Sequence, residues 1–443
     1  TDLPPVSRLP PPASRLRKTL ADWLDHQQRV HPRAIDLGLD RVREVWKKLG
    51  APAPARVVIT VGGTNGKGST VAFLEAMLHA GGQRVGAYTS PHLLRYNERV
   101  RVDGADVDDA ALIDVFERIE AARGETALTY FEYGTLAALL VFAQAKPDVA
   151  LLEVGLGGRL DAVNLVDADA AIVTTVDLDH QDWLGNDRDS IGREKAGIFR
   201  AGRPAIVGES QPPRGLLDEA VRVRADLRRA NRDFVADIRQ ADWRWQCGDV
   251  EIVLPHPVLA APGQHANAAA AIAALHALRD RLPWLPGAIA DGLVRARAPA
   301  RLQRFSSAPE LIVDVAHNPQ AARALAEWLR THASAGRIRA VFGALSDKDV
   351  PGIVRPLADR VAWWHLAGLD GESPRGLSSS ALVERMRSAD EVIHIDGIHD
   401  DVGAALAAAF AGADRGDRIV AFGSFFVAAA ALRFAEARGF RSA

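Results

Sequence analysis

A glycine-rich segment over residues 61–70 carries the clearest chemical signal in the chain. It contains Gly63-Thr64-Asn65-Gly66-Lys67-Gly68-Ser69. Glycines let successive backbone N–H groups face an anion, and the N-terminus of a following helix adds partial positive charge. Lys67 is placed to reach the β- and γ-phosphates of a nucleotide, and the Ser69 hydroxyl could ligate Mg²⁺. A tight turn would explain the glycines but not the lysine and the hydroxyls, so the segment predicts ATP or GTP binding. Gly68 separates the lysine from the serine, which departs from the commonest phosphate-loop spacing.

Oxygen donors and one imidazole follow the expected strands at their ends or begin the next helix. They are Ser69, Ser90, Glu153 and His180. Such a set suits Mg²⁺, which favours oxygen ligands. An exposed strand-end carboxylate would also explain Glu153. However, the preceding residues 150–152 are apolar and are expected to be buried, so the acid needs a partner. His180 alone fits a structural role equally well, and its acidic neighbours between residues 177 and 182 favour an ion-rich site.

The elements that must position these groups alternate between strands and helices. Arg56–Val61 predicts a strand and Thr70–Ala80 a helix, with the glycine segment between them. Further short strands are expected at Val85–Tyr88, Val149–Glu153, Ala171–Val176 and Ala205–Val207. This alternation predicts a mostly parallel α/β sheet, and such sheets bind ligands at the carboxyl ends of their strands.

The pattern changes in the middle of the chain and then restarts. Residues 240–262 alternate as antiparallel edge strands do, and Ala266–Leu278 reads as a helix. A second βα series has strands at Leu311–Val315, Ile338–Phe342, Val361–Leu366, Val392–Ile395 and Ile419–Phe422. We therefore predict two α/β domains, over residues 1–298 and 299–443, the first with a nucleotide-binding P-loop on a parallel sheet and the second Rossmann-like. Before them, residues 1–14 read as a flexible proline-rich arm, and Leu16–Leu24 and Leu39–Leu49 as helices.

Composition excludes several classes of protein. The chain has 443 residues, of which 48% are hydrophobic and 25% charged, the balance of a globular protein. Apolar runs of about eight residues are far shorter than the roughly 18 that span a membrane. Lys plus Arg is 54 against 56 for Asp plus Glu, a net charge of −2, which offers no basic footprint for nucleic acid. The basic stretch Arg222–Arg232 is read as a solvated helix face because acidic residues interrupt it. The single cysteine, Cys247, allows no internal disulfide. A cytoplasmic monomer without membrane or nucleic-acid partners is expected.

The glycine segment resembles the nucleotide loop of the Mur ligase superfamily, in its folylpolyglutamate synthase branch. The likeness extends over nearly the whole chain through Tyr88-Thr89-Ser90-Pro91-His92, Leu152-Glu153-Val154-Gly155-Leu156-Gly157-Gly158-Arg159, Arg193-Glu194-Lys195-Ala196-Gly197, Asp314-Val315-Ala316-His317-Asn318-Pro319 and Gly423-Ser424-Phe425. Bifunctional dihydrofolate synthase/folylpolyglutamate synthases are the most similar branch. The resemblance implies an ATP-binding and pterin-binding first domain and a glutamate-ligase second domain.

The resemblance also assigns ligands. It implies nucleotide contacts from Thr64, Asn65, Gly66, Lys67, Gly68, Ser69, Asn267, Arg301 and Asp314. It implies Mg²⁺ binding by Ser69, Ser90, Glu153 and His180, and a carbamylated Lys195 holding a second Mg²⁺. A solvated helix lysine is the ordinary alternative for Lys195, and capping of a strand-to-helix turn is the alternative for Asp314. The chain has Pro299-Ala300-Arg301 where the family has Pro-Gly-Arg, and alanine adopts a positive φ less readily than glycine.

The substrate residues come from the same resemblance. It gives the pterin to Asp36, Leu37, Gly38, Thr129, Tyr130, Phe131, Glu132, Leu160, Asp161 and Ala162. A flat heteroaromatic ring needs apolar walls and an acceptor for its amide-like edge, although Tyr130 and Phe131 could instead be core residues of the helix that follows. His317, Ser424 and Arg375 are candidates for the incoming L-glutamate.

The expected reaction is ATP-dependent joining of L-glutamate to dihydropteroate, and of further glutamates to tetrahydrofolate, through an acyl phosphate. Lys67, His180, Lys195 and His317 are the expected catalytic residues. Alternatives are a monofunctional folylpolyglutamate synthase, or a P-loop kinase or ATPase acting on another small acid. Peptidoglycan Mur ligases carry an added N-terminal UDP-binding domain, and Gly63 follows too few residues to leave room for one.

Overall fold

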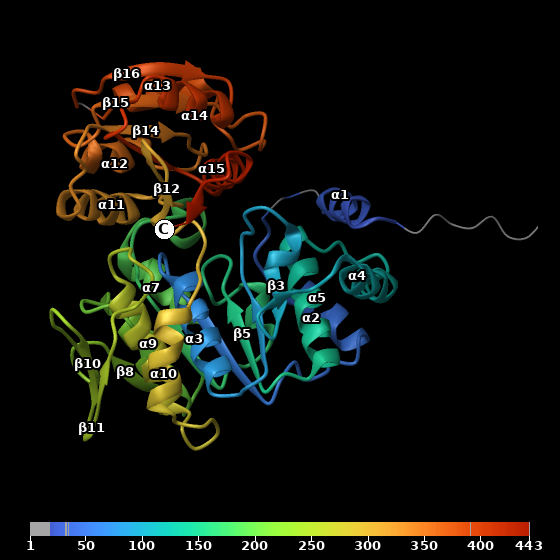
Figure 1. The fold of residues 1–443 in the computed structure, drawn as a ribbon. Helices are drawn as coiled ribbons and strands as arrows, with labels where there is room; N and C mark the ends of the chain where they lie inside the picture. The colour runs from blue at the N-terminus through green and yellow to red at the C-terminus, as the bar shows by residue number, and fades with distance from the viewer. Residues whose placement is uncertain (1–17, 32, 34, 390, 443) are drawn as a thin grey trace, which may run out of the picture.

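The computed structural model describes residues 18–442 except residues 32, 34 and 390. It has a lower unit that contains the chain through the yellow helix of residues 286–295 and an upper unit formed from residue 303 onward (Figure 1). The proline-rich arm expected over residues 1–14 lies outside the described residues. No described helix is both long enough and apolar enough to cross a membrane.

The first sheet has the strand order β4-β3-β2-β5-β1-β6-β7-β8. Its strands are β1 (Val57–Gly62), β2 (Val85–Tyr88), β3 (Val100–Val102), β4 (Ala105–Asp106), β5 (Val149–Glu153), β6 (Ala170–Val173), β7 (Pro204–Val207) and β8 (Asp226–Arg229). Neighbours from β2 to β8 are parallel, and β3 and β4 add an antiparallel edge. Val61 pairs with Glu153 and Gly62 with Val173, so three carboxyl ends meet where the glycine segment begins.

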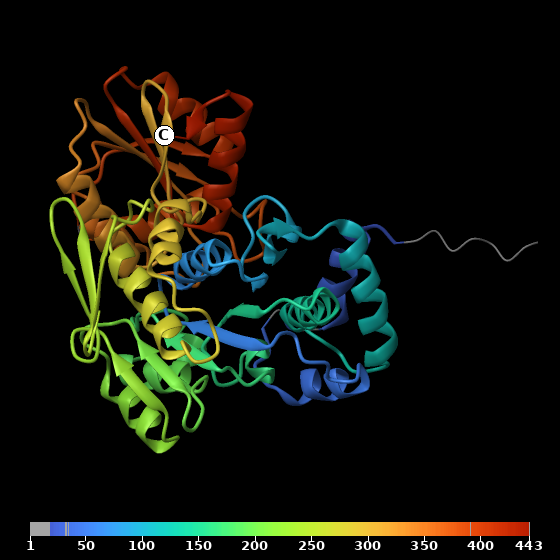
Figure 2. The same cartoon turned by 60° about the horizontal axis from the view of Figure 1, so that its bottom comes forward.

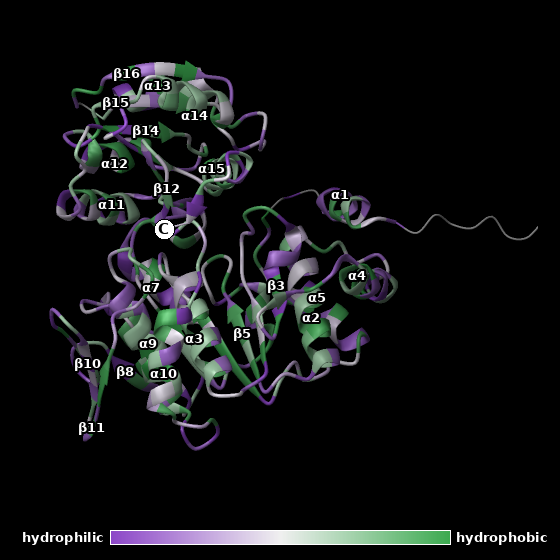
Figure 3. Ribbon diagram, viewed as in Figure 1, coloured by the Kyte–Doolittle hydropathy of each residue, from purple (hydrophilic) through white to green (hydrophobic). Residues whose placement is uncertain are grey.

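Helices cover both faces of this sheet because successive strand residues point to opposite sides. One face is covered by α3 (Lys67–Ala80), α9 (Gln264–Ala277) and α10 (Pro286–Arg295), which pack together (Figure 2). The other is covered by α1 (Leu20–Val30), α2 (Asp40–Lys48), α4 (Asp109–Arg123), α5 (Tyr130–Ala145), α7 (Arg188–Ala196) and α8 (Arg214–Arg222). In β1, Val57 and Ile59 face the first group and Val58 faces the second. Strand β5 and the neighbouring α5 are largely hydrophobic (Figure 3).

A small antiparallel sheet lies beside α9. It consists of β9 (Val235–Ile238), β10 (Trp243–Cys247) and β11 (Val250–Leu254), which confirms the antiparallel strands expected over residues 240–262. Trp243 and Trp245 are fully buried, and the Trp245 indole N–H donates to the Ala269 carbonyl at 3.1 Å. The sheet therefore supports the helix whose N-terminus reaches the glycine segment.

The second sheet has the order β16-β15-β14-β17-β13-β12-β18. Its strands are β12 (Gln303–Ser306), β13 (Glu310–Val313), β14 (Ile338–Phe342), β15 (Trp363–Ala367), β16 (Ile395–His399), β17 (Arg418–Phe422) and β18 (Arg441–Ser442). The strands from β16 to β13 are parallel, and β12 and β18 are antiparallel. Helices α11 (Pro319–Thr331), α12 (Val350–Val354) and α13 (Ser379–Arg387) pack on one face, and α14 (Val402–Ala411) and α15 (Phe425–Ala437) on the other.

Short elements complete the chain. They are η1 (Tyr96–Arg99), η2 (Ala162–Leu165), α6 (Gln181–Leu184) and η3 (Arg355–Leu357). Residues 296–302 connect the two sheets, and within them Ala300 and Leu302 have φ values of +54° and +48°. The position where the family has glycine therefore does adopt a left-handed conformation in this chain.

Several expectations for single elements are wrong. The first described helix begins at Leu20 and ends at Val30 rather than Leu24. The stretch Arg222–Arg232 is not one helix face, because α8 ends at Arg222 and β8 pairs with β7 over Asp226–Arg229. Arginine stems can cover an edge strand while their charged ends pair with acids, as Arg228 does with Asp226 at 2.9 Å. The parallel edge strand expected over Val392–Ile395 instead begins at Ile395. Ile395 pairs with Trp364 of β15.

Candidate active site

The glycine segment joins β1 to α3, as the sequence predicts. Gly63 and Gly66 have φ values of +142° and +88°. A Cβ at Gly66 would lie 2.4 Å from Asn267 Oδ1, and one at Gly63 would lie 1.9 Å from Thr174 Oγ1. Both conformation and space therefore require glycine at these two positions.

Helix α3 begins inside the segment, three residues earlier than expected. Its first turn has backbone N–H groups without helical partners, since the first bond of the helix runs from the Thr70 N–H to the Gly66 carbonyl. Lys67 Nζ donates to the carbonyls of Gly63 at 3.0 Å and Thr64 at 3.1 Å. Burial lowers the pKa of Lys67, and the nearby Glu153 carboxylate acts against that shift. The segment thus gathers N–H donors and one cation at a helix N-terminus, the arrangement that binds phosphate.

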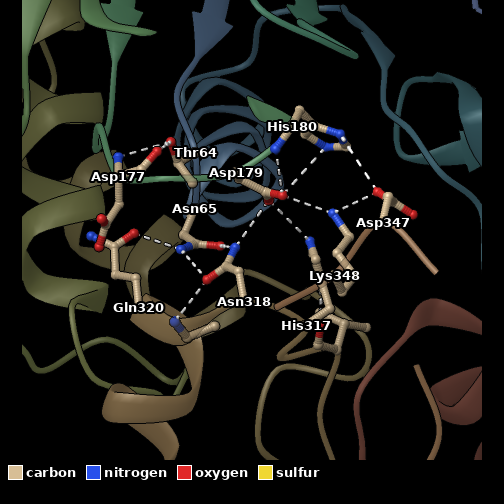
Figure 4. Close-up of polar contacts among 12 residues, drawn as sticks. Thr64, Asn65, Asp177, Asp179, His180, His317, Asn318, Gln320, Asp347 and Lys348 are labelled. Atoms are coloured by element: carbon tan, nitrogen blue, oxygen red, sulfur yellow. Dashed lines mark hydrogen bonds and ion pairs between the residues drawn. The ribbon is translucent and has the colours of Figure 1, made fainter. Parts of the chain in front are cut away.

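The side chains of Thr64 and Asn65 are already engaged by other parts of the protein. Thr64 Oγ1 accepts from the Asp177 N–H at 3.0 Å. The Asn65 amide bonds with Asn318 and Gln320 of the second domain (Figure 4). Both residues are predicted to contact the nucleotide, but their backbone N–H groups are also engaged, that of Thr64 with the Thr175 carbonyl at 2.7 Å and that of Asn65 with Thr175 Oγ1 at 3.0 Å.

Glu153 is a buried carboxylate at the end of β5, with 5% of its surface exposed. Its Oε2 accepts from the Ser90 N–H at 3.2 Å, and Oε1 accepts no hydrogen bond from the described residues. Burial raises its pKa, while Lys67 opposes that effect. Oxygens of Glu153 lie 3.8 Å from the position that a Cβ on Gly68 would occupy. The carboxylate therefore faces the phosphate loop with a free oxygen.

The other predicted magnesium ligands surround the same loop. Ser69 is buried, and its hydroxyl accepts from Gln264 Nε2 at 3.3 Å. His180 has a φ of +52°, an uncommon conformation that clusters at functional sites. Burial lowers its pKa to about 4, so the ring is neutral at pH 7 and has a lone pair to offer. Within residues 18–442, apart from the three undescribed positions, no three His, Cys, Asp or Glu side chains are grouped as a metal site. A cation would therefore need the serine hydroxyls or Lys195.

Lys195 lies near the end of α7 and is 4% exposed. Burial lowers its pKa to about 7, and the positive charge of Lys67 acts in the same direction. Its side-chain amine makes no hydrogen bond to the described residues. A neutral amine is the form that can add CO₂, so its surroundings fit the carbamylation implied by the family resemblance.

Three residues predicted to bind the nucleotide lie where the second domain meets the first. The Arg301 guanidinium lies 5.5 Å from the Phe425 ring centre. Asp314 accepts from the N–H groups of Leu302 and Ala316, each at 2.7 Å, and no described hydrogen bond joins it to Arg301. The turn-capping alternative for Asp314 is therefore observed. Asn267 donates to Gln264 at 3.2 Å.

The predicted pterin residues line the same cavity as the phosphate loop. Arg41 holds Asp36 at 2.8 Å and Glu132 at 3.2 Å. Glu132 also accepts from the Thr129 N–H at 2.7 Å, which closes a capping box at the start of α5. These bonds give both acids a structural role. Arg41 was not predicted, because its role depends on pairing with an acid 91 residues away.

Two aromatic side chains and an acid with a raised pKa belong to the same predicted set. Tyr130 and Phe131 are half-buried, and both pack against the core as well as lining the cavity. The Phe131 ring lies 2.5 Å from the position that a Cβ on Gly155 would occupy, so the ring requires glycine there. Burial raises the pKa of Asp161 to about 6. This acid accepts from the N–H groups of Leu156 and Val163.

Arg99 is a cation that the sequence reading missed. It is 8% exposed, its Nε donates to His92 Nδ1 at 2.9 Å, and its guanidinium lies 5.3 and 5.4 Å from the ring centres of Tyr96 and Tyr130. No carboxylate among the described residues pairs with it. A buried, unpaired arginine is costly and so indicates an anionic ligand. The only sequence signal was its place after Ser90-Pro91-His92.

The three glutamate candidates lie at the edge contributed by the second domain. His317 Nδ1 lies 2.7 Å from the Val315 carbonyl, which fixes the proton on that nitrogen. Ser424 caps α15 by accepting from the Val427 N–H at 3.1 Å. Arg375 lies 3.6 Å from Asp347.

Two charged groups join the domains close to these residues. The Lys348 ammonium lies 2.8 Å from Asp179, which also approaches His317 at 3.7 Å (Figure 4). Together these contacts hold the pKa of Asp179 well below its usual range despite burial. Neither Asp179 nor Lys348 was predicted as a site residue.

One cavity of about 1360 Å³ unites these groups. Every residue that the sequence singled out for the site lines it: Asp36, Leu37, Gly38, Thr64, Asn65, Gly66, Lys67, Gly68, Ser69, Ser90, Thr129, Tyr130, Phe131, Glu132, Glu153, Leu160, Asp161, Ala162, His180, Lys195, Asn267, Arg301, Asp314, His317, Arg375 and Ser424. The missed Arg99 and Gln264 line it too. The volume exceeds that of an ordinary single-ligand pocket, so there is space for more than one substrate.

Family models match both parts of the chain. Residues 61–212 match the Mur ligase middle domain, and residues 300–425 match the glutamate ligase domain of Mur ligases. These ranges contain the phosphate loop and the second sheet, respectively.

Known proteins are similar over almost the full length. The dihydrofolate synthase/folylpolyglutamate synthase of Escherichia coli K12 is 45% identical over 98% of this chain and 98% of its own. A structure of E. coli FolC in complex with DHPP and ADP has a TM-score of 0.88 at 45% identity, covering 95% of this chain and 99% of that one. A structure of a bifunctional folylpolyglutamate synthase/dihydrofolate synthase with Mn, AMPPNP and L-glutamate bound has a TM-score of 0.86 at 46% identity, covering 95% and 98%. The chain belongs to the dihydrofolate synthase/folylpolyglutamate synthase family of Mur ligases.

Proposed function

We propose that this protein is an ATP-dependent ligase that joins L-glutamate to dihydropteroate and adds further glutamates to tetrahydrofolate. The observation that carries the proposal is the single cavity, in which a phosphate loop, a buried free carboxylate oxygen and an unpaired arginine meet the rim of a second domain. Amide formation from an acid needs these parts together, because ATP, the acid and the amine must all reach one point. We expect the protein to act as a cytoplasmic monomer.

The nucleotide would lie at the domain boundary. The N–H groups of the first turn of α3 and the Lys67 ammonium would bind its phosphates, and Lys67 would exchange the carbonyls of Gly63 and Thr64 for phosphate oxygens. Arg301 and Asn267 would contact the rest of the nucleotide from the second domain and α9. Asp314 would act mainly by holding the connection to β12 in place.

The donors fit Mg²⁺, with Glu153, His180, Ser69 and Ser90 as its protein partners and Lys195, once carbamylated, for a second ion. The free oxygen of Glu153 and the neutral ring of His180 are the observations that support this fit. When bound, Mg²⁺ neutralises phosphate charge so that a carboxylate can approach the γ-phosphate.

The acid substrate would lie between the aromatic end of the cavity and the phosphate loop. Tyr130 and Phe131 offer apolar walls for a pterin ring, and Asp161 offers an acceptor for its amide-like edge. Arg99 offers a cation for the carboxylate. These contacts would orient the substrate with its carboxylate toward the nucleotide.

The reaction would proceed in two steps. A carboxylate oxygen attacks the γ-phosphorus, the bond to the β-phosphate oxygen breaks, and ADP and an acyl phosphate form. The amine of L-glutamate, with His317, Ser424 and Arg375 at its binding edge, then attacks the acyl carbon. The C–O bond to phosphate breaks, the amine loses its proton, and an amide and inorganic phosphate remain.

Mass spectrometry of the products tests this proposal. The purified chain is incubated with ATP, Mg²⁺ and L-glutamate, together with either dihydropteroate or tetrahydrofolate. We expect each acid to gain glutamyl residues. Extension of tetrahydrofolate alone would identify a monofunctional folylpolyglutamate synthase, and a phosphorylated product without glutamate would identify a kinase.

A further inference from the structure

The side chain of Asn65 makes its hydrogen bonds with residues of the second domain. Asn65 Nδ2 donates to Asn318 Oδ1 at 3.1 Å and to Gln320 Oε1 at 2.5 Å, and Asn318 Nδ2 donates to Asn65 Oδ1 at 3.0 Å (Figure 4). Donor and acceptor ends of this amide are therefore both occupied from across the domain boundary. The conformation of this phosphate-loop side chain therefore depends on the position of the second domain.

Gln320 reaches the phosphate loop by two routes. Its Oε1 accepts from Thr175 Oγ1 at 3.2 Å as well as from Asn65. Thr175 Oγ1 in turn accepts from the Asn65 backbone N–H at 3.0 Å. Only the carbonyl oxygen of Gln320 takes part in these bonds; its Nε2 donates to no described residue. Gln320 thus acts on both the side chain and the backbone of Asn65.

The start of α11 provides a rigid base for these contacts. Asn318 caps the helix by accepting from the Ala321 N–H at 2.9 Å. One turn beyond Gln320, Arg323 pairs with Asp177 at 2.8 Å, and Asp177 bonds with Thr64 of the loop. The first turns of α11 therefore touch the loop and the segment that follows β6 at several points.

We propose that Gln320 is a positioning residue that couples the seating of the second domain to the shape of the phosphate loop, so that ATP is consumed only when the cavity is closed. The proposal builds on the ligase reaction given above. It adds that contacts with a residue of the second domain help to set the loop that binds the phosphates.

The consequence concerns the fate of the acyl phosphate. In a closed cavity the amine attacks its acyl carbon. If water attacks instead, the same C–O bond breaks, the acid is regenerated and inorganic phosphate is released, and the net reaction is hydrolysis of ATP to ADP and phosphate with release of a proton. Water exclusion by closure prevents such side reactions. A loosened contact at Gln320 should therefore raise the amount of ADP formed for each amide.

The test measures ADP and glutamylated product in the same reaction with dihydropteroate, L-glutamate and ATP. Gln320→Leu removes the acceptor at similar size, and Gln320→Glu keeps an oxygen at that position. Glu327→Leu is the matched control, because Glu327 lies on the same helix and pairs only with Arg330 on the surface. We expect equal ADP and amide for the unaltered chain, for Gln320→Glu and for Glu327→Leu. Gln320→Leu should form at least about twice as much ADP as amide and have a lower kcat.

A combined variant separates coupling from simple damage. If Asn65 transmits the effect, Asn65→Ala should raise the ratio of ADP to amide, and adding Gln320→Leu should raise it no further. Equal ADP and amide with unchanged kcat in Gln320→Leu, or independent effects of the two substitutions, would overturn the proposal. Should Gln320→Leu not fold, the ratio in Asn65→Ala decides alone. Failure of the unaltered chain to form any amide would instead reject the ligase function itself.

Discussion

The two walls of the cavity differ in how far their polar groups are already satisfied. On the first-domain wall Arg99, Glu153 and Lys195 are buried, and each makes at most one hydrogen bond to the described residues. On the second-domain wall Asp314 and Ser424 accept from backbone N–H groups at turns and helix starts.

This difference indicates that the first-domain wall binds ligands and the second-domain wall stabilises the fold. A buried charge without partners costs folding free energy, so a protein keeps it where a ligand supplies the missing partner. A side chain that caps a helix stabilises the fold whether or not a ligand is present. Substitutions on the first-domain wall should therefore reduce activity without loss of stability, whereas those on the second-domain wall should reduce stability first.

The largest effect is expected for Lys67→Ala. Loss of the cation that we propose to bind the transferred phosphate should lower kcat by at least about 100-fold. Because burial already lowers the pKa of Lys67, its removal should leave Tm nearly unchanged. Steady-state ADP release and a thermal melt measure the two quantities. A kcat close to that of the unaltered chain would remove the assignment of the phosphate loop.

Arg99→Met should act on the acid substrate. Hydrogen bonds to charged groups contribute about 1.5–3 kcal/mol, so KM for dihydropteroate should rise about 10- to 100-fold while KM for ATP stays constant. Tm should be equal or higher, since an unpaired buried cation is removed. Arg95→Met is the control, because Arg95 is exposed and pairs with Asp109 on the surface. Equal KM values for the two variants would contradict the role of Arg99.

Lys195 should make stability depend on pH. Its pKa is about 7 in the folded protein, against 10.5 for an ordinary lysine, so between these values the unfolded chain binds a proton that the folded chain lacks. Stability therefore rises with pH across this window, and the penalty for burying the cation is fully present below about pH 7. In CO₂-free buffer, Lys195→Met should flatten the rise of Tm between neutral and alkaline pH. The same slope in both proteins would argue against the depressed pKa.

Ser424→Ala should have the smallest effect on catalysis. Loss of the cap on α15 should cost about 1 kcal/mol of stability, while kcat falls less than about tenfold. Ser378→Ala removes the cap of α13 outside the cavity and should lower Tm similarly with no change in activity. A loss of activity in Ser424→Ala as large as that in Lys67→Ala would break the contrast between the walls.

Local signals explain what the sequence could predict. The glycines, Lys67 and Ser69 between an expected strand and an expected helix identify the phosphate loop within a few residues, and the structure explains Gly63 and Gly66 by their positive φ values. Parallel strands end at one edge, so Ser90, Glu153 and His180 could be expected to meet there without knowledge of side-chain positions.

Signals that depend on tertiary contacts were missed. Asn65 and Gln320 are 255 residues apart in sequence, and no local pattern joins them. In the sequence Arg99 cannot be told from a surface arginine. Only the structure shows that it is buried and that no described carboxylate pairs with it. Strand β8 was not predicted because its arginines resemble a solvated helix face in the sequence. In the structure β8 is an edge strand, and its Arg228 pairs with Asp226.

ADP release from MgATP and dihydropteroate, measured with and without L-glutamate, tests the ligase reaction most directly. With L-glutamate, ADP should form continuously and in equal amount to the amide. Without it, ADP should stop at a burst no larger than the amount of enzyme, because the acyl phosphate then waits in a closed cavity. Continuous ADP release without L-glutamate, or ADP formed with no amide when L-glutamate is present, would contradict the account.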